Sequence, residues 1–254
     1  MMVSRDELRR MAARRKLNLG LLEKEYVLDL VLRSLSAHEE LRQVLVLKGG
    51  TALHKFYVGT RLSLDLDFTA IRPVTVEELR PAIEVADIGA VIAEHRVFHD
   101  ALTVSRLRYF GPLRYVNSIK LDFSFREPVL LLPSELMAAS PYGVPFPVRV
   151  MQVTEIAAEK LRALSMRHAP RDVYDLWIIA THHLATASQT APLVPRKLQT
   201  VGLALDLVAI TGHLTAVEPT WETDLAPLMD DVPEYSQVRN VLDPWLQELF
   251  DQIL

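Results

Sequence analysis

The segment from Arg61 to Phe68, with the sequence RLSLDLDF, alternates polar and apolar residues without interruption. Side chains of a β-strand alternate between its two faces, so this pattern predicts a strand whose leucines and phenylalanine are buried together. Burial fixes the register and places Asp65 and Asp67 side by side on the opposite face. Two adjacent carboxylates repel each other unless a cation lies between them, and their oxygens suit Mg²⁺. A solvated strand face that carries Asp-x-Asp is the alternative interpretation.

A glycine pair precedes this strand. Residues 44–47 are all apolar and are followed, after one lysine, by Gly49 and Gly50. The apolar run predicts a short buried strand and the glycines a tight turn. Thr51 then becomes a candidate N-cap for a helix to about Tyr57. Backbone N–H groups at such a helix start suit phosphate, although many glycine turns bind nothing.

A third alternating segment runs from Ser118 to Phe125. Its apolar residues predict one buried face, and its polar face carries Lys120, Asp122 and Ser124. Taken alone, Asp122 would be read as a solvent-facing acid. Beside the aspartate pair and the glycine turn, it becomes a candidate third carboxylate of the same site.

These motifs resemble the nucleotidyltransferase fold of the polymerase-β type. More narrowly, the sequence resembles the AbiEii family, the nucleotidyltransferase-like toxins of AbiE and MenAT toxin–antitoxin systems. The resemblance rests on five stretches in the family's order, residues 23–28, 47–53, 61–68, 158–164 and 171–176. They cover roughly residues 20 to 180. One departure is Leu64, where many members carry an acid, but both aspartates of the pair remain in place.

The resemblance implies an α+β fold, in which a small mixed sheet with flanking helices is followed by a helical C-terminal domain. Residues 1–150 would form the nucleotidyltransferase catalytic domain. Residues 151–254 would form the mostly helical domain and contribute Lys160, Asp172 and Asp175 to the catalytic site.

The resemblance also implies a role for each residue of the candidate site. Asp65, Asp67 and Asp122 would hold one or two Mg²⁺ ions. The expected nucleotide contacts are Lys48, Gly49, Gly50, Thr51, Arg61, Ser63 and Lys160.

Plainer explanations exist for the residues expected from the second domain. Lys160 falls off the apolar stripe of its predicted helix, as a solvated surface lysine would. Pro170 favours a helix start, where Asp172 would complement the helix dipole without any catalysis. Asp175 lies three residues on, so the two acids occupy neighbouring parts of one helix face. The sequence does not separate their roles.

The activity implied by the resemblance is transfer of a nucleoside monophosphate (NMP) from a nucleoside triphosphate (NTP) to an acceptor hydroxyl. The expected acceptor is the 3′ end of tRNA, whose modification would block translation, and a cognate antitoxin is the expected protein partner. An acceptor on a protein or on a small molecule such as an antibiotic is the alternative. A non-catalytic nucleotide-binding module is a third possibility.

Composition bounds the class of protein. The chain has 254 residues, no cysteine and a net charge of −4. Disulfides and thiolate metal sites are therefore excluded, and no apolar run reaches the roughly 18 residues of a membrane span. The Arg-rich N-terminus has no apolar core of the secretory type. These features predict a cytoplasmic protein without a membrane partner. Acids gather in residues 218–254, and the more basic remainder is compatible with a nucleic-acid substrate.

Local patterns predict the remaining elements. Thr75 starts a helix to about Glu94, and a hairpin follows. Thr154 caps a helix to about Met166. Further expected elements are a helix in the basic N-terminal segment, a second helix that continues it to about residue 35, hairpin strands at 101–110 and 115–125, a loop at 126–147 with a short helix at 134–139, a strand at 149–153, and a C-terminal helix at 235–254.

Overall fold

The computed structural model describes residues 3–253. Met1, Met2 and Leu254, which the predicted domains and terminal helices include, lie outside the described residues. The chain forms two compact units. The first extends to Val129 and resumes at Pro133–Met151, and the second comprises Leu130–Leu132 and the chain from Gln152 onward.

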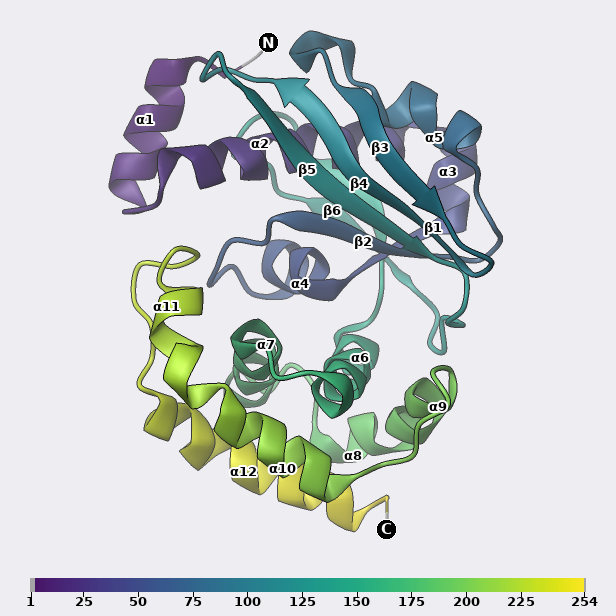
Figure 1. The fold of residues 1–254 in the computed structure, drawn as a ribbon, viewed down its shortest axis with the longest axis vertical. Helices are drawn as coiled ribbons and strands as arrows, with labels where there is room; N and C mark the ends of the chain where they lie inside the picture. The colour runs from purple at the N-terminus through teal and green to yellow at the C-terminus, as the bar shows by residue number, and fades with distance from the viewer. Residues whose placement is uncertain (1–2, 254) are drawn as a thin grey trace. The chain divides into compact units, whose positions relative to one another are not determined.

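A seven-stranded mixed sheet, in the order β3-β4-β5-β2-β1-β7-β6, forms the centre of the first unit (Figure 1). The pairs β2–β5 and β1–β7 are parallel, and the other neighbours are antiparallel. The strands are β1 (Leu45–Lys48), β2 (Asp65–Ala70), β3 (Val91–Val97), β4 (Ala101–Phe110), β5 (Val116–Ser124), β6 (Ser134–Ala138) and β7 (Phe146–Val150). The predicted mixed sheet is confirmed.

Short and long helices flank this sheet. They are α1 (Arg5–Arg14), α2 (Leu19–Ala37), α3 (Glu39–Val44), α4 (Gly49–Ala52), the π-helical turn η1 (Leu53–Tyr57), α5 (Val76–Ile83) and the 3₁₀ turn η2 (Ala86–Ile88). Helix α2 contacts β2, β5 and β7, and in Figure 1 it passes behind β4 and β5. One face of these strands is thus covered by a long helix.

The covered face is the apolar one that alternation predicts. Leu66, Phe68, Leu121 and Phe123 are all buried. The rings of Phe68 and Phe123, which are register partners on β2 and β5, stack with centroids 5.3 Å apart. Because this packing fixes both strands, their polar residues must point to the opposite face.

The second unit is helical, as the predicted fold class requires. Its elements are α6 (Val153–Met166), α7 (Pro170–Thr181), α8 (Ala187–Thr190), the 3₁₀ turn η3 (Ala191–Leu193), α9 (Val194–Gln199), α10 (Leu207–Ala216), the 3₁₀ turn η4 (Glu218–Thr220), α11 (Trp221–Leu225) and α12 (Tyr235–Asp251). Across residues 3–253, no helix combines the length and the apolar character needed to cross a membrane.

Two predicted helices are wrong. The helix from Thr75 ends at Ile83 rather than near Glu94, because Gly89 turns the chain with φ +53° and residues 91–97 then pair with β4. Residues 134–139 form no helix, since β6 pairs with β7 in antiparallel register. Both strands are stabilised by pairing with the next strand along the chain, and the local sequence patterns of residues 91–97 and 134–138 do not reveal this pairing.

Two predicted caps are also wrong. Helix α4 begins at Gly49, so Thr51 lies inside the helix, and its Oγ1 donates to the carbonyl oxygen of Asp65 at 2.6 Å. The N-cap of α6 is Gln152 rather than Thr154. The strand expected at 149–153 is displaced to Phe146–Val150.

Glu23 on α2 is a fully buried acid whose Oε1 accepts a hydrogen bond from the Leu113 N–H at 2.7 Å. Burial raises the pKa of Glu23 above its ordinary value of 4.5. A carboxyl group with a raised pKa in the folded state contributes stability at low pH that is lost as pH rises through that pKa. Glutamine at position 23 keeps an oxygen that accepts the hydrogen bond from Leu113, but it does not ionise. Glu23→Gln should therefore not lose stability as the pH rises.

We therefore expect Glu23→Gln to raise the melting temperature relative to wild type at pH 7.5, with a smaller difference at pH 4.5. Thermal unfolding at the two pH values measures this. Glu40→Gln, at an exposed position on α3, is the matched control and should follow wild type. An identical pH dependence for Glu23→Gln and wild type would contradict the interpretation.

Candidate active site

The sheet register brings the candidate carboxylates onto one face. Strands β2 and β5 are parallel neighbours in which Asp65 pairs with Lys120 and Asp67 with Asp122. Register partners share a face of the sheet, which here is the face opposite the buried phenylalanines. All three aspartates are half-buried. Residues distant in sequence therefore lie on adjacent strands.

Asp122 is held by two neighbours on that face. Its Oδ2 lies 2.5 Å from Nζ of Lys120, and its Oδ1 accepts a hydrogen bond from Oγ1 of Thr103 at 2.6 Å. Burial acts to lower the pKa of Lys120, but the hydrogen bond and charge of Asp122, with the charges of Asp67 and Asp65, raise it above its ordinary value. Three carboxylates thus act on one ammonium group.

This arrangement bears on the predicted metal site. Carboxylate oxygens are the ligands that Mg²⁺ prefers, and the ammonium of Lys120 already occupies a cation's place beside Asp122. In the side-chain conformations of this structure, residues 3–253 contain no cluster of three or more His, Asp or Glu residues that could hold a metal ion. The donor set fits a hard divalent cation. Convergence of Asp65, Asp67 and Asp122 on one ion stays a prediction.

The glycine turn lies against the aspartate pair. Gly49 has φ +71°, and a Cβ at this position would lie 2.5 Å from Oδ2 of Asp67. Lys48, the register partner of Asp67 on β1, is buried, and its Nζ lies 2.9 Å from Oε2 of Glu127. The backbone of the turn therefore lies against Asp67, a predicted metal ligand. The charge of Lys48 is balanced by Glu127.

The next predicted phosphate contacts also gather at the turn. A Cβ at Gly50 would lie 2.8 Å from Nη2 of Arg61 and 3.0 Å from Oγ of Ser63. Arg61 is buried and donates from Nη1 to the carbonyl oxygen of Leu62 at 2.8 Å. Backbone donors, a guanidinium group and a hydroxyl are thus close together, as phosphate binding requires.

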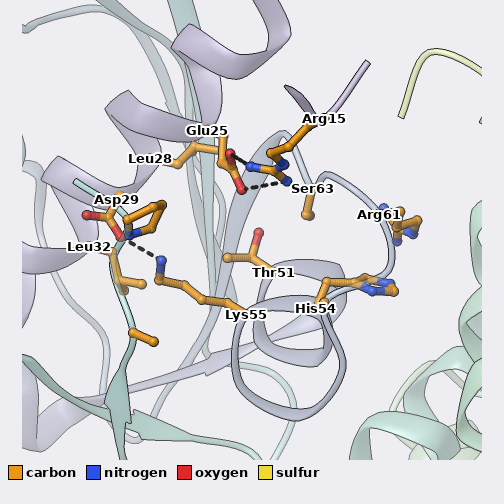
Figure 2. Close-up of a pocket in the computed structure, with 13 residues that line it drawn as sticks. Arg15, Glu25, Leu28, Asp29, Leu32, Thr51, His54, Lys55, Arg61 and Ser63 are labelled. Carbon is orange, nitrogen blue, oxygen red and sulfur yellow. Dashed lines mark hydrogen bonds and ion pairs between the residues drawn. The ribbon is translucent and has the colours of Figure 1, made fainter. Parts of the chain in front are cut away.

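A pocket of about 160 Å³ opens beside this turn. Thr51, Arg61 and Ser63 contribute to its wall, and Figure 2 shows them across the pocket from Asp29. Two ion pairs complete the wall: Nη1 of Arg15 lies 2.7 Å from Glu25, and Nζ of Lys55 lies 2.5 Å from Asp29. The polar wall suits part of a charged ligand.

The second unit contains the other predicted residues. Nζ of Lys160 lies 2.9 Å from Oδ1 of Asp172 and 2.6 Å from Oδ2 of Asp175. Nε of Arg167 lies 2.9 Å from the other oxygen of Asp172. Lys160 and both acids are buried, so the alternative of a solvated surface lysine is wrong. Asp172 binds two cationic side chains and does more than complement a helix dipole.

Comparison with known proteins identifies the family. A model of the family described as "Nucleotidyl transferase AbiEii toxin, Type IV TA system" matches residues 31–253. The chain belongs to the AbiEii family. It is therefore a nucleotidyltransferase toxin of a type IV toxin–antitoxin system, with an NTP substrate and an antitoxin partner. Nucleotidyltransferases of this kind generally use a divalent metal. No curated protein gives a significant match.

Solved structures show the same fold as this AbiEii chain. MenT4, a nucleotidyltransferase toxin from Mycobacterium tuberculosis H37Rv, has 23% sequence identity and a TM-score of 0.78, with 98% of this chain and 90% of MenT4 covered. JHP933 from Helicobacter pylori has 19% identity and a TM-score of 0.59, with 93% and 94% of the two chains covered. The predicted nucleotidyltransferase fold is thus confirmed.

The sequence analysis missed several pocket residues of the AbiEii chain. Arg15, Lys55 and His54 line the pocket, but none belongs to an alternating or glycine-rich pattern. Nδ1 of His54 lies 3.1 Å from the carbonyl oxygen of Val58. The conversion of the helix into the π-helical turn η1 positions His54 and Lys55, and no signal in the sequence indicates such a turn.

Asp172 makes a testable contribution to stability. Burial acts to raise its pKa, but Lys160 and Arg167 outweigh burial and lower the pKa below its ordinary value of 3.8. A carboxyl group with a lowered pKa in the folded state stabilises the protein at pH values above its unfolded-state pKa. This stabilisation is lost as the pH falls through the folded-state pKa.

We expect Asp172→Asn to be less stable than wild type at pH 7, because it leaves Lys160 with one carboxylate fewer, and the difference should shrink below about pH 4. Urea unfolding at pH 7 and pH 3 measures this. Asp206→Asn in the same unit, which removes an exposed charge but keeps an oxygen that can accept the capping hydrogen bond from Ala209, is the control for a general loss of charge. An equal difference at both pH values would contradict the assignment.

Proposed function

We propose that this AbiEii chain transfers NMP from an NTP to the 3′-terminal hydroxyl of tRNA and thereby blocks translation. In this proposal Asp65, Asp67 and Asp122 hold one or two Mg²⁺ ions. The observation that carries it is the register pairing of Asp67 with Asp122, with the turn at Gly49 against the same carboxylate. The candidate metal ligands and the candidate phosphate-binding turn are therefore adjacent, as nucleotidyl transfer requires.

The reaction forms a bond between the acceptor oxygen and the α-phosphorus, breaks the bond to the β-phosphate oxygen, and releases pyrophosphate and the hydroxyl proton. When bound, Mg²⁺ would lower the pKa of the attacking hydroxyl and neutralise part of the charge of the triphosphate. Backbone donors at Gly49, Gly50 and Thr51 would hold the triphosphate in line with the acceptor. Arg61 and Ser63 would contact its oxygens, since both lie beside the turn.

Lys48 and Lys160 are the remaining proposed phosphate contacts. Each ammonium group is held by carboxylates, Lys48 by Glu127 and Lys160 by Asp172 and Asp175. These acids would orient the lysines and offset their charge until substrate arrives. We further expect the toxin to act in the cytoplasm, where tRNA is available.

The experiment is incubation of purified protein with each α-labelled NTP, Mg²⁺ and total tRNA. Label should enter tRNA, and Asp65→Ala should reduce the rate by about 10²-fold or more. Asp87→Ala, which removes an exposed acid of the same unit, should label like wild type. If label enters a protein or a small molecule instead, that molecule and not tRNA is the acceptor. Transfer that survives Asp65→Ala would overturn the site assignment.

A further inference from the structure

Strand β4 presents a row of exposed residues on the face that carries the aspartates. Leu107 and Tyr109 are buried on the covered face, so Arg108 and Phe110 point to the other side. Arg108 pairs with Ser118 of β5, which precedes Asp122 on the same face. Figure 1 shows β3, β4 and β5 side by side, with α2 passing behind them.

A bulge adds a second arginine to this row. Val104 pairs with Leu121 and Leu107 with Ile119, so Ser105 and Arg106 together oppose Lys120. Both bulged residues therefore lie on the side of Lys120, away from the core.

The row is exposed and carries positive charge. Arg106 and Arg108 are exposed, and the cross-strand partner of Arg106 on β3 is Glu94. Phe110 is 53% exposed, although aromatic side chains are usually buried. On β3, Arg96 pairs with Thr103 and lies 3.9 Å from Glu94. We call Arg106, Arg108, Phe110 and Lys120 the basic face.

We propose that the basic face binds the single-stranded 3′ end of the acceptor RNA, with the arginines on phosphates and Phe110 stacked on a base. This inference rests on the proposed function. Phosphate contacts supply most of the affinity for nucleic acid, and exposed aromatic side chains on a sheet are suited to unstacked RNA bases. The alternation of Arg106, Arg108 and Phe110 along one strand combines both kinds of contact.

The position of the basic face favours RNA over other anions. Ser118, the partner of Arg108, lies four residues before Asp122, a separation of roughly 13 Å along the strand. The triphosphate of an NTP would already be held at the glycine turn, so it would not extend to Arg108. An acidic protein could pair with the arginines, but its binding would not require continuity with the catalytic carboxylates. A strand of RNA whose last hydroxyl reacts does require it.

The test measures binding of fluorescently labelled tRNA by anisotropy at several salt concentrations. Arg106→Gln/Arg108→Gln should weaken binding about 10-fold and reduce the slope of log K against log salt by about 1.4, the value for two lost single-strand phosphate contacts. Phe110→Ala should weaken binding about 5-fold or more with the salt slope unchanged. The arginine variant should raise KM for tRNA and leave KM for NTP unchanged.

Arg72→Gln/Arg80→Gln is the matched control, because it removes the same charge from two exposed arginines that already pair with Glu78 and Glu84. This control should bind tRNA like wild type.

Equal affinity and equal salt slope for wild type and the Arg106/Arg108 variant would overturn the inference, as would a wild type that does not bind tRNA. If wild type labels no tRNA at all, the proposed function fails; if it labels tRNA with KM unchanged in both variants, only the basic face fails.

Discussion

Replacement of Asp67 by asparagine should reduce NMP transfer by about 10³-fold, equivalent to about 4 kcal/mol of transition-state stabilisation. Asp67 lies between the other parts of the candidate site, because it pairs with Asp122 of β5 in register and also lies against the glycine turn at Gly49. Asparagine keeps the shape of the side chain but removes the negative charge, so the proposed metal ligand is weakened while packing is preserved. Single-turnover transfer with saturating NTP and Mg²⁺ measures the effect.

Two controls make this result specific. Asp87→Asn, at an exposed position in the same unit, should retain wild-type activity. The melting temperature of Asp67→Asn should not fall, since the removal of one of several neighbouring acids reduces repulsion. Activity within tenfold of wild type would show that Asp67 is no metal ligand.

Gly49→Ala should reduce transfer by about 10²-fold and cost about 1–3 kcal/mol of folding stability. The backbone has φ +71°, which favours glycine, and the added Cβ would lie 2.5 Å from Oδ2 of Asp67. Relief of this clash requires the turn or the carboxylate to move, and in the proposed mechanism either movement would misplace the triphosphate relative to the metal ligands.

Gly202→Ala separates backbone strain from the clash. Gly202 has φ +70°, but a Cβ there would meet nothing within 4 Å. This variant should lose similar stability and keep its activity. Chemical denaturation and the transfer assay, applied to both variants, compare the two quantities. Equal activities for Gly49→Ala and Gly202→Ala would mean that the glycine turn does not position substrate.

Alternation predicted the strands that carry the site, because burial of Leu66, Phe68, Leu121 and Phe123 leaves the aspartates no other face. The pairing of Asp67 with Asp122 could not be predicted in the same way. It depends on which strands become neighbours and on their register, and local patterns set neither. The order of motifs in the AbiEii family supplied the expectation that physical reasoning from the sequence could not.

The errors have a common cause. Strands β3 and β6 form because β4 and β7 lie beside them, whereas their own sequences favoured a helix or a loop. Lys160 falls off the apolar stripe of its helix and is nevertheless buried, because Asp172 and Asp175 of α7 satisfy its charge. In each case the deciding contact is with the next element along the chain, which the pattern of the segment itself does not show.

The most direct measurement is an anomalous difference map from crystals of the protein grown with Mn²⁺ and a non-hydrolysable NTP. We predict a manganese peak within about 2.2 Å of carboxylate oxygens of Asp65 and Asp67, with Asp122 released from Lys120 and turned toward the metal. The triphosphate should lie on the backbone at Gly49 and Gly50. Manganese bound elsewhere, with Asp122 still paired to Lys120, would contradict the account.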